Sequence, residues 1–354
     1  MNMTMKSDAA ILQEILMEMN RQIDLYRPGP FWQAAIEGLC VDLNTYGIDR
    51  FRSMPSVLAF FAPTYGSPGV NFSASQIEKI RDRLQGLFLQ ESKQALAVEE
   101  FLSGSAQALA DYRVFQAASP SSGQLNLSHF SESTYGDPTE QHQFDGRRYS
   151  RSSLNYLLGL SFLKQHIGDA PIRKVMEIGG GFGSLGEILL TAQSGVQQYI
   201  NLDIAPTLYF ANAYLGHVLG ESRVECRWHA GTEKIDIAQL KEATVAAPWL
   251  LEQLEGSIDL FVNFISFQEM EPHIVTNYLR HVERFSPRWV LLRNMREGKQ
   301  QRTASNPVGV DTPIKADDYE LMLTNYRLVA RSTMPFGYKT ADGYHSELSL
   351  FERH

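Results

Sequence analysis

The sequence of 354 residues has little cysteine, no long apolar run and no cluster of side chains with metal-ligand spacing. Its two cysteines, Cys40 and Cys226, are far apart in the chain, which is typical of a reducing compartment and not of a disulfide scaffold. No stretch approaches the ~20 apolar residues that span a bilayer, and the N-terminal residues lack the apolar core of a signal peptide. We therefore expect a cytoplasmic protein with no membrane partner and no metal.

An excess of positive charge is also absent, because the formal net charge is −8. A mildly acidic surface does not attract a phosphate backbone, so we expect no nucleic-acid partner. The hydrophobic fraction of 44% is enough to bury a sizeable core. A small-molecule ligand fits these properties better than a nucleic acid does. The sequence does not determine the oligomeric state, and a homo-oligomer is possible.

The chain divides into three parts by its residue patterns. Residues 1–117 carry apolar residues at helical spacing, for example from Ile11 to Ile23, and predict an α-helical N-terminal domain. Residues 118–151 are polar and long for a connection, yet contain aromatic residues, which favours an ordered loop or lid. Two of these aromatics, Tyr135 and Tyr149, are candidates to contact a substrate.

Residues 152–354 alternate between strand and helix patterns. This alternation predicts an α/β fold with a Rossmann-like, doubly wound, mostly parallel sheet of seven strands. The last two strands follow each other closely and predict a terminal antiparallel hairpin. The expected strands are 174–178, 198–203, 223–228, 258–263, 289–293, 326–334 and 346–352, with a helix near 237–246 between the third and the fourth.

A glycine-rich turn follows the first of these strands, in the segment Glu177-Ile178-Gly179-Gly180-Gly181-Phe182-Gly183. Glycines 179, 181 and 183 allow a ligand to approach the backbone at a strand–turn–helix junction. The segment also contains G-x-G-x-x-G, the dinucleotide fingerprint, which by itself does not identify the ligand.

Two carboxylates help to choose between a dinucleotide and the methyl donor S-adenosylmethionine. In a dinucleotide site Glu177 would face the diphosphate and repel it. In a methyl-donor site it would attract the cationic amino-acid end of S-adenosylmethionine. Asp203 ends the second strand, where a carboxylate accepts hydrogen bonds from ribose hydroxyls, with Ile204 beside it. We therefore predict S-adenosylmethionine as the cofactor, with a nicotinamide or flavin dinucleotide and a purely structural turn as the alternatives; Asp203 alone also fits a helix N-cap.

The segment after the fourth strand is a second candidate for the site, because ligands of open parallel sheets lie beyond the carboxyl ends of the strands. Asn263 and Phe264 would contact the cofactor, and Gln268 and Glu269 would bind or deprotonate an acceptor. The alternative for Glu269 is a first-turn acid of the helix that begins at Pro272.

Methylation of a hydroxyl group needs a base, and an anionic acceptor needs a cation. His273 and His345 are the candidate bases, although a lone histidine is more often structural. Arg293 and Arg296 follow the fifth strand and are candidates to hold a phosphate or carboxylate, with a solvated loop as the alternative.

Three segments resemble the bacterial sugar O-methyltransferase family, a branch of the class I S-adenosylmethionine-dependent methyltransferases. They are EIGGGFGSLGEILL from Glu177, NLDIAP from Asn201 and DLFVNFISFQEMEP from Asp259, and the resemblance covers about the last 200 residues. It implies donor-site roles for Glu177, Gly179, Gly181 and Asp203, and active-site roles for Gln268 and Glu269. After the third strand, where many relatives have an acid against adenine, this chain has His229-Ala230-Gly231-Thr232, so backbone groups or Thr232 would contact the adenine.

The sequence thus predicts methyl transfer from S-adenosylmethionine to an oxygen of a small polar acceptor, such as a sugar or a sugar-containing metabolite. The alternatives are an O- or N-methyltransferase that acts on a peptide or natural-product intermediate, a methyltransferase-like module without activity, and a dinucleotide oxidoreductase.

Overall fold

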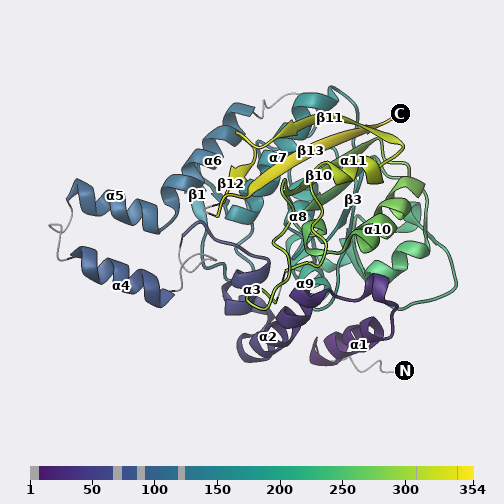
Figure 1. Cartoon of the computed structure of the whole chain (residues 1–354), viewed down its shortest axis with the longest axis horizontal. Helices are drawn as coiled ribbons and strands as arrows, with labels where there is room; N and C mark the ends of the chain where they lie inside the picture. Colours follow the sequence, from purple (N-terminus) through teal and green to yellow (C-terminus); the bar gives the residue numbers. More distant parts are fainter. Residues whose placement is uncertain (1–7, 67–73, 86–91, 119–123, 308, 341) are drawn as a thin grey trace.

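The computed structural model of the chain describes residues 8–66, 74–85, 92–118, 124–307, 309–340 and 342–354. Over these residues the largest sheet has nine strands, eight of them in the order β11-β13-β10-β9-β3-β4-β7-β5, with β12 paired to β13 (Figure 1). The strands are β3 (Lys174–Ile178), β4 (Gln198–Leu202), β5 (Val224–Arg227), β7 (Ala243–Ala246), β9 (Leu260–Phe264), β10 (Trp289–Met295), β11 (Tyr326–Ser332), β12 (Tyr338–Lys339) and β13 (His345–Arg353).

The sheet is parallel from β5 to β10 and antiparallel at β13 and β11. From β3 the chain moves to one side through β4 and later returns to β9 on the other side, so the strand order reverses between β3 and β9. This arrangement confirms the predicted Rossmann-like α/β fold with antiparallel C-terminal strands, which is the fold of class I methyltransferases.

One predicted element is wrong, and the error changes the number of strands. The segment expected as a helix near 237–246 contains only a 3-10 turn (Ile237–Gln239), followed by the strand β7. β7 lies between β4 and β5, so the expected third strand becomes the edge strand. Thr244 and Val245 are β-branched and fully buried, and this burial outweighs the helical propensity of the surrounding alanines. With β12, the sheet has nine strands instead of seven.

The helices of the α/β part form two groups. α7 (Arg151–Ile167), α8 (Ser184–Thr191) and α9 (Thr207–Leu219) pack side by side. α10 (Pro272–Arg284) and α11 (Asp318–Met322) each place a tyrosine ring, Tyr278 and Tyr319, parallel to the ring of Phe267. Within the described residues, no helix combines the length and the apolar character required to cross a membrane.

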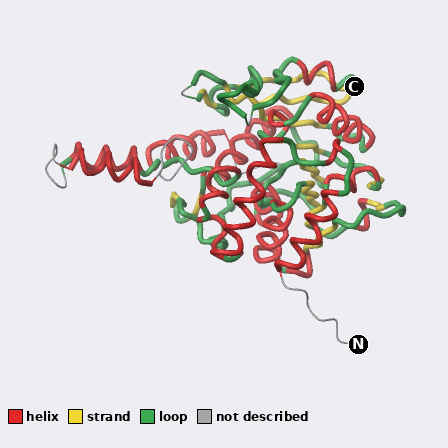
Figure 2. Tube along the Cα trace, turned by 60° about the horizontal axis from the view of Figure 1, so that its bottom comes forward, coloured by secondary structure: helices red, strands yellow, loops and turns green. Residues whose placement is uncertain are grey.

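The N-terminal part is helical, as predicted. Its helices are α1 (Asp8–Asn20), α2 (Pro30–Tyr46), α3 (Pro55–Phe60), α4 (Ala74–Gln85), α5 (Lys93–Leu102) and α6 (Ser105–Ala118). The sequence also predicts one helix over residues 92–116; the structure divides it at Gly104, whose φ of 74° ends α5. α4 and α5 extend away from the rest of the molecule, whereas α6 packs on α7 (Figures 1 and 2). The sequence further predicts a loop at 60–73 and a helix at 75–90; half of that loop and the end of that helix lie outside the described residues.

The connection after α6 is described from residue 124 and contains a short hairpin of β1 (His142–Phe144) and β2 (Arg147–Tyr149). Its carboxylate Glu132 is fully buried and forms an ion pair of 2.7 Å with Arg52, which follows α2. The Ser150 hydroxyl at the start of α7 donates to the same carboxylate. This buried pair therefore joins the N-terminal helices, the connection and the α/β part.

Removal of one partner of the buried ion pair should destabilise the protein strongly, because the other charge stays buried without a partner. We expect Arg52→Met to lower the free energy of unfolding by about 3–5 kcal/mol. The matched control is Arg50→Met, since the Arg50–Asp137 pair is 60% exposed at both side chains and should contribute less than about 1 kcal/mol. Denaturant unfolding measures both, and equal losses would contradict the role of the buried pair.

Candidate active site

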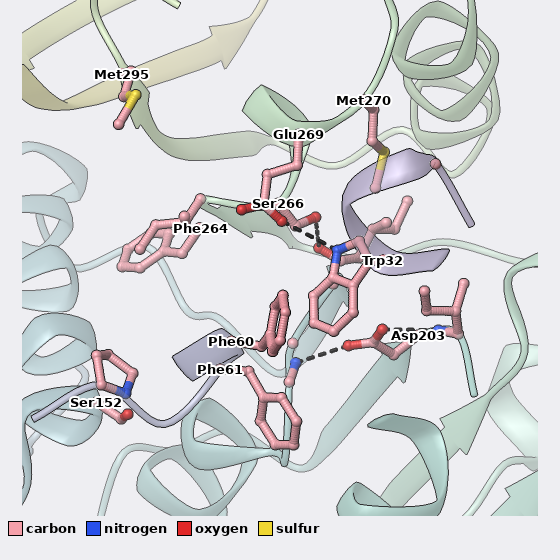
Figure 3. A pocket seen from close by; sticks show the side chains of 18 of the residues that line it. Trp32, Phe60, Phe61, Ser152, Asp203, Phe264, Ser266, Glu269, Met270 and Met295 are labelled. Atoms are coloured by element: carbon pink, nitrogen blue, oxygen red, sulfur yellow. Dashed lines mark hydrogen bonds between the residues drawn. The ribbon is translucent and has the colours of Figure 1, made fainter. Parts of the chain in front are cut away.

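A cavity of about 780 Å³ lies at the carboxyl ends of β3, β4 and β9, where the strand order reverses (Figure 3). Residues from three parts of the chain line it. The glycine turn and the strand ends contribute Gly179, Gly181, Asp203, Ile204, Phe264 and Glu269. The N-terminal part contributes Trp32, Phe60, Phe61 and Tyr65, and the beginning of α7 and β12 contribute Arg151, Asn155, Tyr156 and Tyr338.

The glycine turn forms part of the cavity wall, and two of the glycines that line the cavity have a positive φ. Gly179 has a φ of 74°, and a Cβ atom there would overlap the Ser266 hydroxyl. Gly181 has a φ of 59° and no neighbour that a Cβ would meet, so its backbone is open to the cavity. The predicted role of the turn, close approach of a ligand to the backbone, fits this geometry. Gly183 lies one step further, at the start of α8 and against Leu215, and does not line the cavity.

Asp203 faces the cavity beside the glycine turn. Its carboxylate accepts hydrogen bonds from the backbone N–H groups of Gly181 and Ile204, each at 2.8 Å. Burial raises the pKa of Asp203 to about 7, although the two N–H groups favour the charged form. Two backbone bonds leave further lone pairs of the carboxylate for the hydroxyl groups of a ligand.

Glu177 lies beneath the turn and not in the cavity, which differs from the predicted direct contact with a cofactor. It is fully buried and accepts hydrogen bonds from the hydroxyls of Tyr156, at 2.8 Å, and Tyr199, at 2.5 Å. Burial raises the pKa of Glu177 to about 8. Tyr156 lines the cavity and stacks on Phe264 with ring centroids 4.9 Å apart. Glu177 therefore acts on the cavity by holding Tyr156.

Glu269 lies in the 3-10 turn after β9 and lines the middle of the cavity (Figure 3). Trp32 of α2 donates its indole N–H to Glu269 Oε2 at 3.1 Å, and Lys299 donates to Oε1 at 3.2 Å. Burial raises the pKa of Glu269, while Lys299 opposes the shift. Lys299 also lies 3.5 Å from the ring centroid of Phe31. The helix after Glu269 does begin at Pro272, but the contact with Trp32 fixes this carboxylate in the cavity wall.

Two further predicted residues support the wall from behind. The Asn263 amide donates to the carbonyl of Ile178 at 2.9 Å, at the end of β3. The side-chain oxygen of Gln268 accepts the backbone N–H of Met295 at 2.8 Å, at the end of β10. Both side chains are buried and neither lines the cavity. Their polar groups are used to join strand ends.

The predicted bases and Thr232 do not reach the cavity. His273 is exposed on the first turn of α10, and the Nδ1 atom of His345 lies 2.7 Å from Glu297. Thr232 follows the edge strand β5, because β7 takes the place next to β4. Pro248, which follows β7, lines the cavity in its stead.

The predicted substrate contacts also lie elsewhere. The Tyr135 ring stacks on His217 at 4.0 Å, and Tyr149 is fully buried beside Tyr112. Aromatic side chains in this polar segment anchor it to α6 and α9 by apolar contact. Arg296 is exposed and pairs with Glu347, while Arg293 is buried behind the cavity.

Some lining residues carried no signal in the sequence. Trp32 belongs to an apolar helical pattern that is typical of a core. Phe60 begins a segment that the sequence predicts as a loop, and Arg151 is the last residue of the polar segment, without a recognisable motif. Their spatial proximity to Asp203 and Glu269 comes only from the tertiary fold. Over the described residues, no group of three or more histidine, cysteine or acidic side chains could hold a metal ion.

No protein-family model matches the chain, and no curated protein matches it in sequence. Solved methyltransferase structures do resemble it at low identity. The small RNA methyltransferase HEN1 is 17% identical with a TM-score of 0.40, over 61% of this chain and 27% of that chain, so this chain spans about a quarter of its length.

Two further solved structures extend the same likeness. The magnesium protoporphyrin IX methyltransferase of Synechocystis PCC 6803, solved with bound SAH, is 16% identical with a TM-score of 0.37, over 57% of this chain and 83% of that chain. The mitomycin 7-O-methyltransferase MmcR is 12% identical with a TM-score of 0.36, over 99% of this chain and 74% of that chain. These likenesses concern the fold.

The buried Glu177 should make the stability of the protein depend on pH. An acid whose pKa is higher in the folded chain binds more protons when folded, so stability falls as pH rises from the usual value of 4.5 to about 8. Glutamine carries no charge. The free energy of unfolding of Glu177→Gln, relative to wild type, should therefore increase with pH over this window.

Denaturant unfolding at pH 5, 6.5 and 8 measures this difference. Loss of a hydrogen bond to Tyr156 or Tyr199 adds a constant offset that does not vary with pH. Glu233→Gln, at an exposed position, is the control and should show no such trend. A difference between Glu177→Gln and wild type that stays constant with pH would disprove the buried charge.

Proposed function

We propose that this protein transfers a methyl group from S-adenosylmethionine to an oxygen of a small polar acceptor, such as a sugar or a sugar-containing metabolite. The observation that carries the proposal is that the glycine turn, Asp203 and Glu269 line one continuous cavity. A donor and an acceptor can meet in such a cavity, with water excluded by the N-terminal residues Trp32, Phe60 and Phe61.

The residues at the glycine turn fit S-adenosylmethionine. Gly181 is open to the cavity, and Asp203 beside it can accept hydrogen bonds from ribose hydroxyls. The buried acids Glu177 and Asp203 favour a ligand with a positive charge over the diphosphate of a dinucleotide. When bound, S-adenosylmethionine supplies a methyl group on a sulfonium that a nucleophile can attack.

We infer that Glu269 is the general base for the acceptor hydroxyl. It lines the cavity, and Trp32 and Lys299 hold each of its oxygens in place. Burial raises its pKa, which makes the carboxylate a better proton acceptor, while Lys299 keeps the charged form accessible. His273 and His345 are not part of this proposal because neither lines the cavity.

Ligand binding at Asp203 tests the donor site. By titration calorimetry, we expect S-adenosylmethionine and S-adenosylhomocysteine to bind in the micromolar range, with no binding of NAD. Asp203→Ala should weaken both by about 1–3 kcal/mol. Ribose hydroxyl donors favour the ionised carboxylate of Asp203, whose pKa is about 7 without ligand. The affinity of the wild type for both ligands should therefore fall as the pH decreases below 7. The affinity of Asp203→Asn should show no such fall. Binding of NAD in place of the methyl donor would disprove the proposal.

Methyl transfer tests Glu269. With an acceptor found by a screen for labelled methyl transfer, we expect Glu269→Gln to lower kcat by about 10²–10⁴-fold, while the affinity for S-adenosylhomocysteine stays near that of wild type. Glu283→Gln, on α10 and outside the cavity, is the control. An unchanged kcat and pH–rate profile in Glu269→Gln would remove Glu269 as the base, and a methylated amine product would indicate N-methylation instead.

A further inference from the structure

The cavity has a second charged end, opposite the glycine turn, which we call the arginine end (Arg151, Arg293, Tyr65, Tyr338). Arg151 is the first residue of α7 and lines the cavity. Its Nη1 donates to the carbonyl of Thr64 at 2.8 Å, and its guanidinium lies 5.7 Å from the ring centroids of both Tyr65 and Tyr338. Among the described residues, no carboxylate forms an ion pair with it.

Arg293 lies behind the same wall. Its side chain is 1% exposed, with Nε donating to the Ser346 hydroxyl and Nη1 to the carbonyl of Asn155, each at 3.0 Å. Its guanidinium lies 5.2 Å from the ring centroid of Tyr338. The Tyr338 ring therefore contacts two guanidinium groups, those of Arg293 and Arg151. Hydrogen bonds to neutral oxygens leave the charge of Arg293 without an ionic partner in the described chain, which is costly in a buried position.

Within the described residues, Asp111 is an acid that interacts electrostatically with both arginines. The Asp111 carboxyl group accepts a hydrogen bond of 2.5 Å from the Tyr65 hydroxyl, and burial raises its pKa. It balances at most one of the two guanidinium charges. In a protein with a net charge of −8, this end of the cavity therefore has a local excess of positive charge.

The opposite end of the cavity holds two acids. Asp203 lines it and Glu177 lies beneath it, and within the described residues neither carboxyl group forms an ion pair. Figure 3 shows Ser152, the neighbour of Arg151, on the other side of the cavity from Asp203. The two ligands that share the cavity therefore meet different fields, one that favours a cation and one that favours an anion.

We propose that the acceptor carries an anionic group, a carboxylate or a phosphate, which binds against Arg151 at the arginine end. This proposal rests on the proposed methyl transfer and narrows its acceptor class to acidic molecules. Arg151 can present two N–H groups to such an anion, and the N-terminus of α7 adds a favourable dipole beside it. Ser152 and Asn155 line the same wall and offer neutral polar groups to the rest of the acceptor.

The experiment is titration calorimetry on the full chain saturated with S-adenosylhomocysteine. The probes are glucuronate, glucose 6-phosphate, inorganic phosphate and neutral glucose. We expect glucuronate or glucose 6-phosphate to bind more tightly than glucose, and the better of the two to identify the anion as a carboxylate or a phosphate. In Arg151→Gln the affinity of that probe should fall by about 10–100-fold, with a smaller loss in Arg151→Lys.

The matched control is Arg113→Gln, which removes the same charge from an exposed position on α6 and should leave probe affinity unchanged. Binding of S-adenosylhomocysteine by a variant shows that the variant is folded. If the wild type does not bind S-adenosylhomocysteine, the proposed methyl transfer is rejected but the anion site is not. The same probes are then titrated in the absence of S-adenosylhomocysteine. Equal binding of glucose and the anions, no anion binding at probe concentrations up to ~10 mM, or full affinity in folded Arg151→Gln and Arg151→Lys would overturn the anion site.

Discussion

The side-chain amide of Asn263 holds together the strand ends on which the cavity depends. Its nitrogen donates to the Ile178 carbonyl of β3 and to the Ser266 hydroxyl, and its oxygen accepts from the backbone of Phe267 and the amide of Asn294. At this point the chain leaves β3 and β9 in opposite directions, and the pairing of the two strands ends at Glu177 and Val262. The fully buried Asn263 amide pairs two backbone groups there, the Ile178 carbonyl and the Phe267 N–H. The glycine turn and the Glu269 turn consequently keep a fixed separation.

The N-terminal helices complete a site that the α/β part leaves open. Trp32 reaches Glu269 across 237 positions of the sequence, and the backbone N–H groups of Tyr65 and Gly66 donate to Glu140. Residues 124–150 therefore act on the cavity indirectly, by holding the segment that carries Tyr65. Aromatic side chains from this part form an apolar section of the cavity wall, and an apolar wall strengthens electrostatic interactions beside it.

The sequence predicted the local features of the site and missed those that depend on distant contacts. The glycine turn and Asp203 are recognisable because neighbours in the chain determine their geometry. The hydrogen bonds of Glu177 to Tyr156 and Tyr199 join three separate elements, and no spacing reveals them. β7 was predicted as a helix because its alanines have high helical propensity, whereas its burial next to β4 is a tertiary effect. That one misassigned segment changes the strand order, and the short strand β12 accounts for the other additional strand.

Several buried charges around the cavity, other than Glu269 with its partner Lys299, are held by neutral hydrogen-bonding groups. Tyrosine hydroxyls and backbone N–H groups surround the acids at the glycine-turn end, and carbonyl and hydroxyl oxygens surround Arg293 at the arginine end. These neutral groups fix the positions of the charges without cancelling them. Raised pKa values of about 7 and 8 for Asp203 and Glu177 are the consequence, because protonation relieves a charge that lacks a counter-ion. A cation at one end and an anion at the other would supply both counter-ions, so in the proposed reaction the two ends of the cavity would orient their ligands before methyl transfer.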